Sequence, residues 1–470
     1  MQKLLPHRLG IGLTSLALFG FCGSAPDLPS PTGEAPKPDA FGKLPKVAIY
    51  DRDPHHIWNR LYAALYVRTT KDGQVYGNDE LDPFLWPDSK YLLTELRYQQ
   101  VLALLDEFQA TNCAKLIRDP LKKAMFQRDL WAIFDWLADY DPEHQKEKRH
   151  RRELGKRLGR IIGQVALSAE EIRGLPDNYA VAVGSKTFPP KHDPSDPKKP
   201  FLPPELLATD GPWVLLGVRG GLLAAPFHVQ FFGGRSAFFV LMKLPQGRKA
   251  TLDYLQKLRS FPNPLMPRPA DRGGPGPPLP ILNPDLPQFP VGTQVALVRE
   301  MMLIDNQGTI TPTRLIEAIQ FRVFRDIPGK ENVPLERFDF LYSRQDFYEF
   351  QLRRKDLFSE RAGGLHPVGS QEEESAYHLF LGSLQVTSDP LESAGSERSS
   401  GMAVILKSCT HCHGGPHVSG GPGIHSLRSY RRDFSQPPDL VDVSRQWEEE
   451  AAVRSKRQHY SWGLLQGLLE

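Results

Sequence analysis

The chain has 470 residues, enough for two or three domains that each bury a core. Its 58 Lys and Arg residues nearly balance 55 Asp and Glu residues, which excludes overall charge as a reason to expect nucleic acid as a partner. With 40% hydrophobic residues, the composition is that of a soluble globular protein. The 43 prolines and 39 glycines predict long connections rather than very long helices.

Residues 1–25 have the pattern of an export signal. Lys3 and Arg8 supply positive charge, and the apolar or small-residue run Leu9–Phe21 follows. That run is too short to span a bilayer comfortably but suits a signal peptide. Cys22 raises the alternative of a lipid anchor, which we do not favour. We therefore expect an exported protein of the periplasm or cell envelope, with no transmembrane segment in the mature chain.

Residues 26–45 form a Pro-rich linker, and residues 46–175 are predicted to be a helical region. The apolar spacing predicts helices over 94–109 and 122–140. The basic run 144–160 contains no aromatic residue for stacking, so we expect a solvated helix face rather than a docking patch for an anionic partner. The predicted buried faces of the first two helices are Leu96, Val101, Leu104, Leu105 and Phe108, and Phe126, Leu130, Ile133, Phe134 and Leu137.

Residues 176–390 are predicted to be β-rich, because short apolar or alternating runs are bounded there by Gly, Pro and Asn. These runs favour an antiparallel sheet or sandwich, with a turn over 305–308. A Ser/Gly/Glu-rich hinge over 391–402 precedes a C-terminal module, residues 403–470. The predicted strands are 179–188, 211–218, 226–244, 293–305 and 316–327, with a helix over 251–261. The predicted fold class is α+β multidomain.

Three cysteines follow the leader, namely Cys113, Cys409 and Cys412. An odd number argues against a disulfide scaffold. Cys113 lies at the end of a helical pattern, so we expect it to be a small buried hydrophobic residue. The adjacent pair His55 and His56 is expected to lie in an exposed loop rather than to bind a metal.

The densest cluster of reactive side chains is Lys407–His417, with the sequence KSCTHCHGGPH. Within it, Cys409, Cys412 and His413 form the pattern C-x-x-C-H. This pattern resembles the haem attachment site of c-type cytochromes, and the resemblance covers the C-terminal segment only. It implies that the two thiols form thioethers with one haem c and that His413 is the proximal iron ligand. It also implies a small α-helical, cytochrome c-like module.

The resemblance leaves the sixth iron ligand open. The commonest class of monohaem cytochromes places a methionine well downstream of the motif, but the last methionine here is Met402, which precedes it. His425 and His459 are therefore the tentative distal ligands. His366 and His378 from the β-rich region are further alternatives.

The same cluster admits two other hypotheses. Cys409 and Cys412, with two of His413, His417 and His425, match a tetrahedral Cys2His2 site for Zn2+ in an exported structural or interaction protein. A thioredoxin-like dithiol requires a βαβ context, which the sequence around the motif does not provide.

The function that these patterns predict is electron transfer through a covalently bound haem, with a periplasmic redox protein as the partner. The chain contains no G-x-S-x-G and no H-E-x-x-H motif, so we assign no catalytic residue. An electron carrier is expected rather than a catalyst, and a haem-dependent oxidoreductase stays open. No nucleic-acid partner is expected.

Overall fold

The structure is a computed structural model that describes part of the chain. The described residues all belong to one compact unit, Lys37–Glu470. They are residues 44–69, 75–77, 92–139, 145–263, 265–266, 281–283, 285, 287–326, 345–368 and 440–469.

The helices come first along the chain, and strands alternate with helices later. The helical elements are α1 (Ile57–Tyr66), α2 (Glu95–Ala110), η3 (Cys113–Lys115), α3 (Pro120–Asp139), α4 (Gln145–Gln164), α5 (Ala169–Arg173), α6 (Asn178–Gly184), α7 (Pro226–Phe231), α8 (Arg248–Ser260), α10 (Arg354–Phe358), η5 (Arg361–Gly364), α12 (Arg445–Arg457) and α13 (Tyr460–Leu469). The strands are β1 (Arg68–Thr69), β2 (Val75–Tyr76), β3 (Val214–Val218), β4 (Ser236–Lys243), β5 (Leu265–Met266), β6 (Ile281–Leu282), β7 (Gln294–Ile304), β8 (Ile310–Phe324), β9 (Gln345–Leu352), β10 (Leu365–Pro367) and β11 (Leu440–Asp442).

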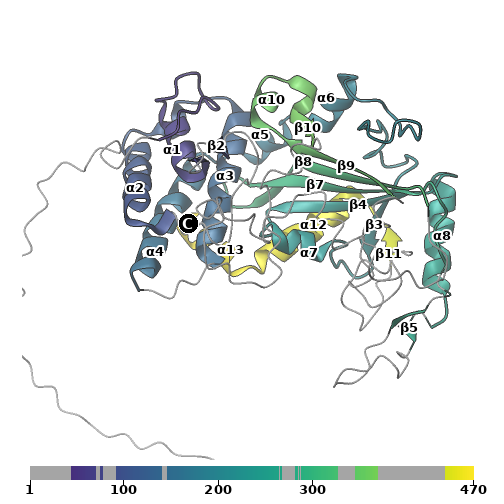
Figure 1. Cartoon of the computed structure of the whole chain (residues 1–470). Coiled ribbons are helices and arrows are strands. Elements are labelled where there is room, and N and C mark those ends of the chain that lie inside the picture. The colour runs from purple at the N-terminus through teal and green to yellow at the C-terminus, as the bar shows by residue number, and fades with distance from the viewer. Residues whose placement is uncertain are drawn as a thin grey trace, which may run out of the picture. The chain divides into compact units, whose positions relative to one another are not determined.

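Seven strands form one antiparallel sheet in the order β10-β9-β8-β7-β4-β3-β11. Figure 1 shows α1 to α4 grouped at one end of this sheet and α8 at the other. The two shortest strands of this sheet, β10 and β11, form its opposite edges. The prediction of an α+β fold with an antiparallel sheet is confirmed.

A long hairpin of β7 and β8 lies at the centre of the sheet. The predicted turn over 305–308 joins its strands. Asp305 accepts hydrogen bonds from the backbone N–H groups of Gln307 (2.9 Å) and Thr309 (2.8 Å). Gly308 takes a φ of +72°, which other residues rarely adopt.

Both faces of the sheet are covered, as the alternation along β4 shows. Ala237, Phe239 and Leu241 join the main core, whereas Phe238 and Met242 pack in smaller clusters with α7 and α8. The main core is a single cluster of packed side chains whose first member in the sequence is Val47 and whose last is Leu465. It includes residues of helices α1 to α4, of the sheet and of both C-terminal helices. The described helical and β-rich regions therefore share one core.

The two long helices predicted near the N-terminus are present as α2 and α3. Every residue of the predicted buried face of α3 is buried, and so are four of the five in α2. Leu96 is the exception, because 67% of it is exposed in the first turn of α2. The basic run 144–160 lies largely within α4, whose apolar face, including Leu154 and Leu158, is buried.

The prediction of a strand over 179–188 is wrong, because residues 178–184 form α6. Asp177 caps this helix by accepting a hydrogen bond from Ala180 N (2.9 Å), and this local cap overrides the β-propensity of the valines. The run 226–244 also begins as a helix, α7, before it becomes β4. The strands expected within 211–218, 293–305 and 316–327 and the helix over 251–261 are present.

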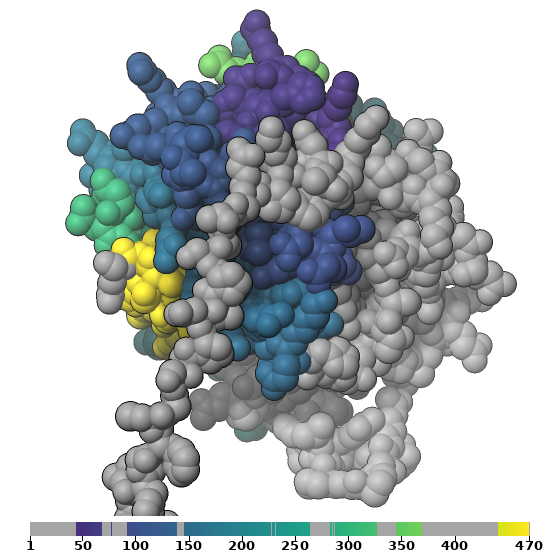
Figure 2. Space-filling model, turned by 90° about the vertical axis from the view of Figure 1, so that its left-hand side faces the viewer, coloured from purple at the N-terminus to yellow at the C-terminus, as the bar shows by residue number. Residues whose placement is uncertain are grey.

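The C-terminal residues differ from the expected separate module. Within 403–470 the structure describes residues 440–469, which belong to the main body: β11 pairs with β3, and Ala452, Trp462 and Leu465 lie in the main core. Figure 2 shows the C-terminal end of the chain (yellow) beside the β7–β8 turn (green), in agreement with the position of Leu469 about 4.0 Å from a Cβ built on Gly308.

No described helix is long and apolar enough to cross a membrane.

Candidate functional site

The three residues of the C-x-x-C-H motif, Cys409, Cys412 and His413, lie outside the described residues. So do Met402, His378, His411, His417 and His425. Two of the alternative iron ligands, His459 and His366, lie in the described part of the chain.

The segment that carries the motif starts and ends on opposite edges of the sheet. The described residues before this segment end just after β10, and those after it begin with β11. Five strands separate these two edges, so they lie about 29 Å apart at the usual spacing of about 4.8 Å between strands.

His459 lies at the junction of α12 and α13. Its N–H donates to Lys456 O (3.0 Å), and its carbonyl accepts from Trp462 N (3.1 Å). The half-buried imidazole lies against Gly234, where an added Cβ would come within 3.3 Å of His459 Nε2. Gly234 has a φ of +70°, so both its backbone and its neighbours require glycine.

The surroundings of His459 favour its neutral form. Desolvation is the largest cause that lowers its pKa, and the charges of Lys456 and Arg235 lower it further, while Asp135 acts in the opposite direction. A neutral imidazole is the form that binds metals. Yet the described residues contain no group of three or more His, Cys, Asp or Glu side chains that could hold a metal ion.

Beside His459 lies the first of three buried ionic clusters, centred on Asp135 of α3. Its Oδ2 accepts hydrogen bonds from Arg235 Nη1 (2.9 Å) and Lys456 Nζ (2.6 Å). Lys456 also donates to Gly233 O (2.8 Å) and Ser461 Oγ (3.2 Å). This cluster joins α3, the turn before β4 and the two C-terminal helices.

Two cations thus share one carboxylate in the Asp135 cluster. Burial alone would raise the pKa of Asp135, but Lys456 and Arg235 more than offset it and hold the pKa below the ordinary value. Asp135 Oδ1 is buried without a hydrogen-bond partner. The cluster therefore carries a net positive charge.

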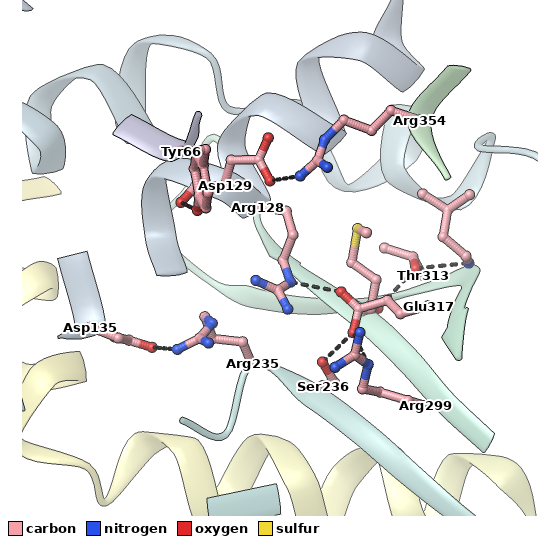
Figure 3. A network of polar contacts seen from close by, with 12 residues as sticks. Tyr66, Arg128, Asp129, Asp135, Arg235, Ser236, Arg299, Thr313, Glu317 and Arg354 are labelled. Carbon is pink, nitrogen blue, oxygen red and sulfur yellow. Dashed lines mark hydrogen bonds and ion pairs between the residues drawn. The ribbon is translucent and has the colours of Figure 1, made fainter. Parts of the chain in front are cut away.

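The second cluster is centred on Glu317 and depends on a bulge in β8. Arg299 pairs with Ala318 and Glu300 with Ile316, so Glu317 is the extra residue of the bulge. Its carboxylate contacts Arg128 Nε (2.7 Å) of α3, Arg299 Nε (3.1 Å) and Ser236 Oγ (2.5 Å). Figure 3 shows these side chains converging on Glu317 of β8 from α3 and from the strands β4 and β7.

The third cluster is centred on Asp129, which directly follows Arg128 in α3. Its carboxylate accepts hydrogen bonds from Tyr50 Oη (2.6 Å) and from the guanidinium of Arg354. Burial is the largest cause that raises the pKa of Tyr50, and Asp129 raises it further. Tyr66 donates to the backbone carbonyl of Asp129 (2.6 Å).

A single helix, α3, therefore supplies one member of each cluster: Arg128, Asp129 and Asp135 (Figure 3). All three are at most 1% exposed. Buried charges require such partners, because leaving a charge unpaired in the interior costs several kcal/mol, about 3–5. The sequence analysis recognised the apolar residues of α3 but missed these charges. Their signal was the pair Arg128-Asp129 in the middle of a helix, where the residues three and four positions away on both sides are all apolar.

Cys113, the first cysteine after the leader, is buried, with 3% of it exposed, as predicted. Its Sγ lies 2.9 Å from Thr111 Oγ1. Burial raises the pKa of this thiol, with a smaller opposite effect of Thr111, so Cys113 is poorly suited to react as a thiolate.

The other described histidines of interest have ordinary structural positions. His55 is exposed, and His56 caps α1 through its side chain. This agrees with the predicted loop. His366 lies in the edge strand β10, opposite Gln351 of β9.

Comparisons with known protein families, with curated proteins and with solved structures find no match to this chain.

Proposed function

We propose that this chain is an exported electron-transfer protein that carries one haem c on Cys409 and Cys412, with His413 as the proximal iron ligand. The observation that carries the proposal is the C-x-x-C-H pattern of residues 409–413 in a chain whose first 25 residues resemble an export signal. When bound, the haem supplies reversible one-electron chemistry at its iron. The partner is a periplasmic redox protein.

The environment of Cys113 supports this proposal. Its thiol is buried in the core with a raised pKa, so it does not compete with Cys409 or Cys412 for a haem or a disulfide. Cys22 lies in the leader. The two motif cysteines are then left as a pair, as thioether attachment requires.

The path of the chain supports a revised organisation. Residues 369–439, which include the motif, connect the two edge strands β10 and β11. The haem segment is thus an insertion anchored to the body at both ends, rather than a C-terminal module on a hinge. Two anchors restrict where the haem can be presented to a redox partner.

Of the two tentative distal ligands, we assign His425 in preference to His459. The imidazole of His459 lies against Gly234, next to the buried cations Lys456 and Arg235. Coordination would have to remove it from this packing. His425 lies twelve residues after His413, in the same segment of the sequence.

The proposal is tested by producing the chain together with a c-type maturation system and recording its absorption spectrum before and after denaturation. We expect a Soret band that stays with the unfolded polypeptide and disappears in a Cys409→Ser/Cys412→Ser double variant. Cys113→Ala is the matched control and keeps the band. A colourless protein that releases one zinc ion per chain to a chelator would instead support the Cys2His2 site.

The ligand assignment has its own readout in the same spectra. His425→Ala should convert a six-coordinate, low-spin spectrum into a high-spin one, and His459→Ala should leave it unchanged. The far-red charge-transfer band typical of methionine ligation would contradict a histidine at the sixth position.

A further inference from the structure

Helix α4 exposes a continuous stripe of positive charge. Arg149, Arg152, Lys156 and Arg160 follow the spacing i, i+3, i+7, i+11, so they share one face, and all four are exposed. The stripe is about 16 Å long at about 1.5 Å per residue. Among the described residues, only Lys156 of these four has a carboxylate within ion-pair distance, Glu153 at 3.7 Å.

The neighbouring acids are already paired with other cations. Asp106 binds Arg157 (2.7 Å), and Glu95 binds Lys146 at the start of α4. These pairs lie on the side of α4 that faces α2. The basic stripe therefore keeps a net positive charge of several units.

Helix α13 lies beside α4 and contains no charged residue. Its exposed face is formed by Tyr460, Gly463, Leu464 and Gly467, which follow the spacing i, i+3, i+4, i+7. Tyr460 is 68% exposed and Leu464 is 41% exposed. A Cβ added at either glycine would meet nothing within 4 Å, so this face is open.

The two exposed faces lie next to each other. A Cβ built on Gly159 of α4 would come within 2.8 Å of Leu468, and one on Gly163 within 3.2 Å of Leu469. On both helices the exposed stripe is the side opposite the buried residues, so the basic and apolar stripes form one surface.

We propose that this surface, which we name the α4–α13 face, docks on a membrane that contains anionic lipids. Cations attract the lipid phosphates, and each Lys or Arg near such a surface strengthens binding by roughly fivefold. The tyrosine and leucine beside them suit the boundary between headgroups and acyl chains. Nucleic acid fits less well, because α13 offers its phosphates no cation.

The sequence alone favoured a solvated face for the basic run because it lacks aromatic residues. The structure adds Tyr460 and Leu464 from a helix almost 300 residues further along the chain. The inference does not depend on the haem. It concerns how the body of the protein is held, whatever its redox activity.

The test is co-sedimentation of the full chain with vesicles of phosphatidylcholine, with and without phosphatidylglycerol. All proteins carry Cys22→Ser, so that no lipid anchor contributes. We expect binding to the anionic vesicles that weakens at least tenfold between about 0.05 M and about 0.5 M salt. Arg152→Glu/Arg160→Glu should weaken binding at least 25-fold, because two attractive charges become repulsive.

The matched control is Lys249→Glu/Arg259→Glu on α8, at the other end of the sheet, which changes the net charge equally. It should bind within twofold of the parent chain. Arg152→Lys/Arg160→Lys keeps the charge and should also bind normally.

A pair of variants at Gly467 tests the face without a risk of unfolding. Glycine is a poor helix former and the site is open, so either replacement should stabilise α13. Gly467→Glu should weaken vesicle binding at least fivefold, whereas Gly467→Lys should strengthen it. Equal binding by these two variants, or binding of the parent chain to an acidic protein but not to anionic vesicles, would overturn the proposal.

Discussion

At the scale of single residues, the interior of this protein depends on charges that α3 buries. The Asp135 cluster is the clearest case, because one carboxylate balances two cations and one of its oxygens has no hydrogen-bond partner. In such a cluster, loss of the anion and loss of one cation have unequal effects. Removing the anion leaves two buried positive charges, whereas removing one cation leaves a matched pair.

This asymmetry gives a prediction for Asp135 and Lys456. Asp135→Asn should lower the free energy of unfolding by about 3–5 kcal/mol, because it removes the charged carboxylate that Arg235 and Lys456 share in the interior. Lys456→Met keeps the Asp135–Arg235 pair and should cost only about 1–2 kcal/mol, mainly for its lost hydrogen bonds. Urea unfolding measures both, with Lys257→Met on the exposed side of α8 as the control. Equal losses in the two cluster variants would contradict this account.

A second residue-scale prediction concerns acid. Burial lowers the pKa of His228 in α7 from 6.5 to about 4. Between pH 6.5 and about pH 4, His228 is therefore protonated in the unfolded chain but not in the folded chain. The stability of the folded chain is fully present above pH 6.5 and decreases as the pH falls towards about 4. His459, whose pKa is also lowered, acts in the same direction.

The measurement is the free energy of unfolding across that pH range. In the parent chain this free energy should fall with decreasing pH, and the share of His228 is at most about 1.4 kcal/mol per pH unit, because one group exchanges at most one proton. His228→Gln should flatten the slope, and His55→Gln in an exposed loop should not. A slope that survives His228→Gln unchanged would assign the effect to other groups.

At the scale of elements, the spacing of apolar residues identified most of the helices and strands that pack in the core. The helices α2 and α3 and the strands β7 and β8 have apolar patterns that local sequence determines, and the turn at Asp305 has its own side-chain hydrogen bonds. The element α6 was missed because its valines favour a strand while Asp177 caps a helix. The edge strand β11 has three residues, too few for a pattern, and it exists only because β3 offers an unpaired edge.

The candidate site likewise has one part that the local sequence predicts and another that it does not. The spacing of Cys409, Cys412 and His413 is local, so the sequence is sufficient to propose a haem attachment site. The Asp135 cluster joins residues up to 321 positions apart, and no local sequence pattern predicts such a contact. Likewise, the pairing of a basic helix with an uncharged one in the α4–α13 face depends on the tertiary fold.

The two tryptophans of the C-terminal helices give an element-scale prediction. Trp447 of α12 is 39% exposed, whereas Trp462 of α13 is 4% exposed and lies in the main core. Trp462→Ala should therefore cost about 3–5 kcal/mol of unfolding free energy. Trp447→Ala should cost less than about 1 kcal/mol. Calorimetry or urea unfolding with a single cooperative transition separates the two, and a small loss at Trp462 would mean that residues 440–469 are not part of the main core.

At the scale of the whole molecule, the described body is one α+β unit whose sheet receives strands from both sides of the segment that carries the motif. Because α12 and α13 pack in the main core, we expect them to stabilise the body although they follow the motif in the sequence. In our two proposals, the body anchors the haem segment at both edges of the sheet, and the α4–α13 face binds an anionic membrane.

The central claim is that a haem is covalently attached to this chain, and intact mass measurement on the denatured protein tests it most directly. After production with a c-type maturation system, the polypeptide should carry the added mass of one haem, confined to the peptide that contains Cys409 and Cys412. A chain with free thiols at both positions, whether colourless or bound only to zinc before denaturation, would contradict it.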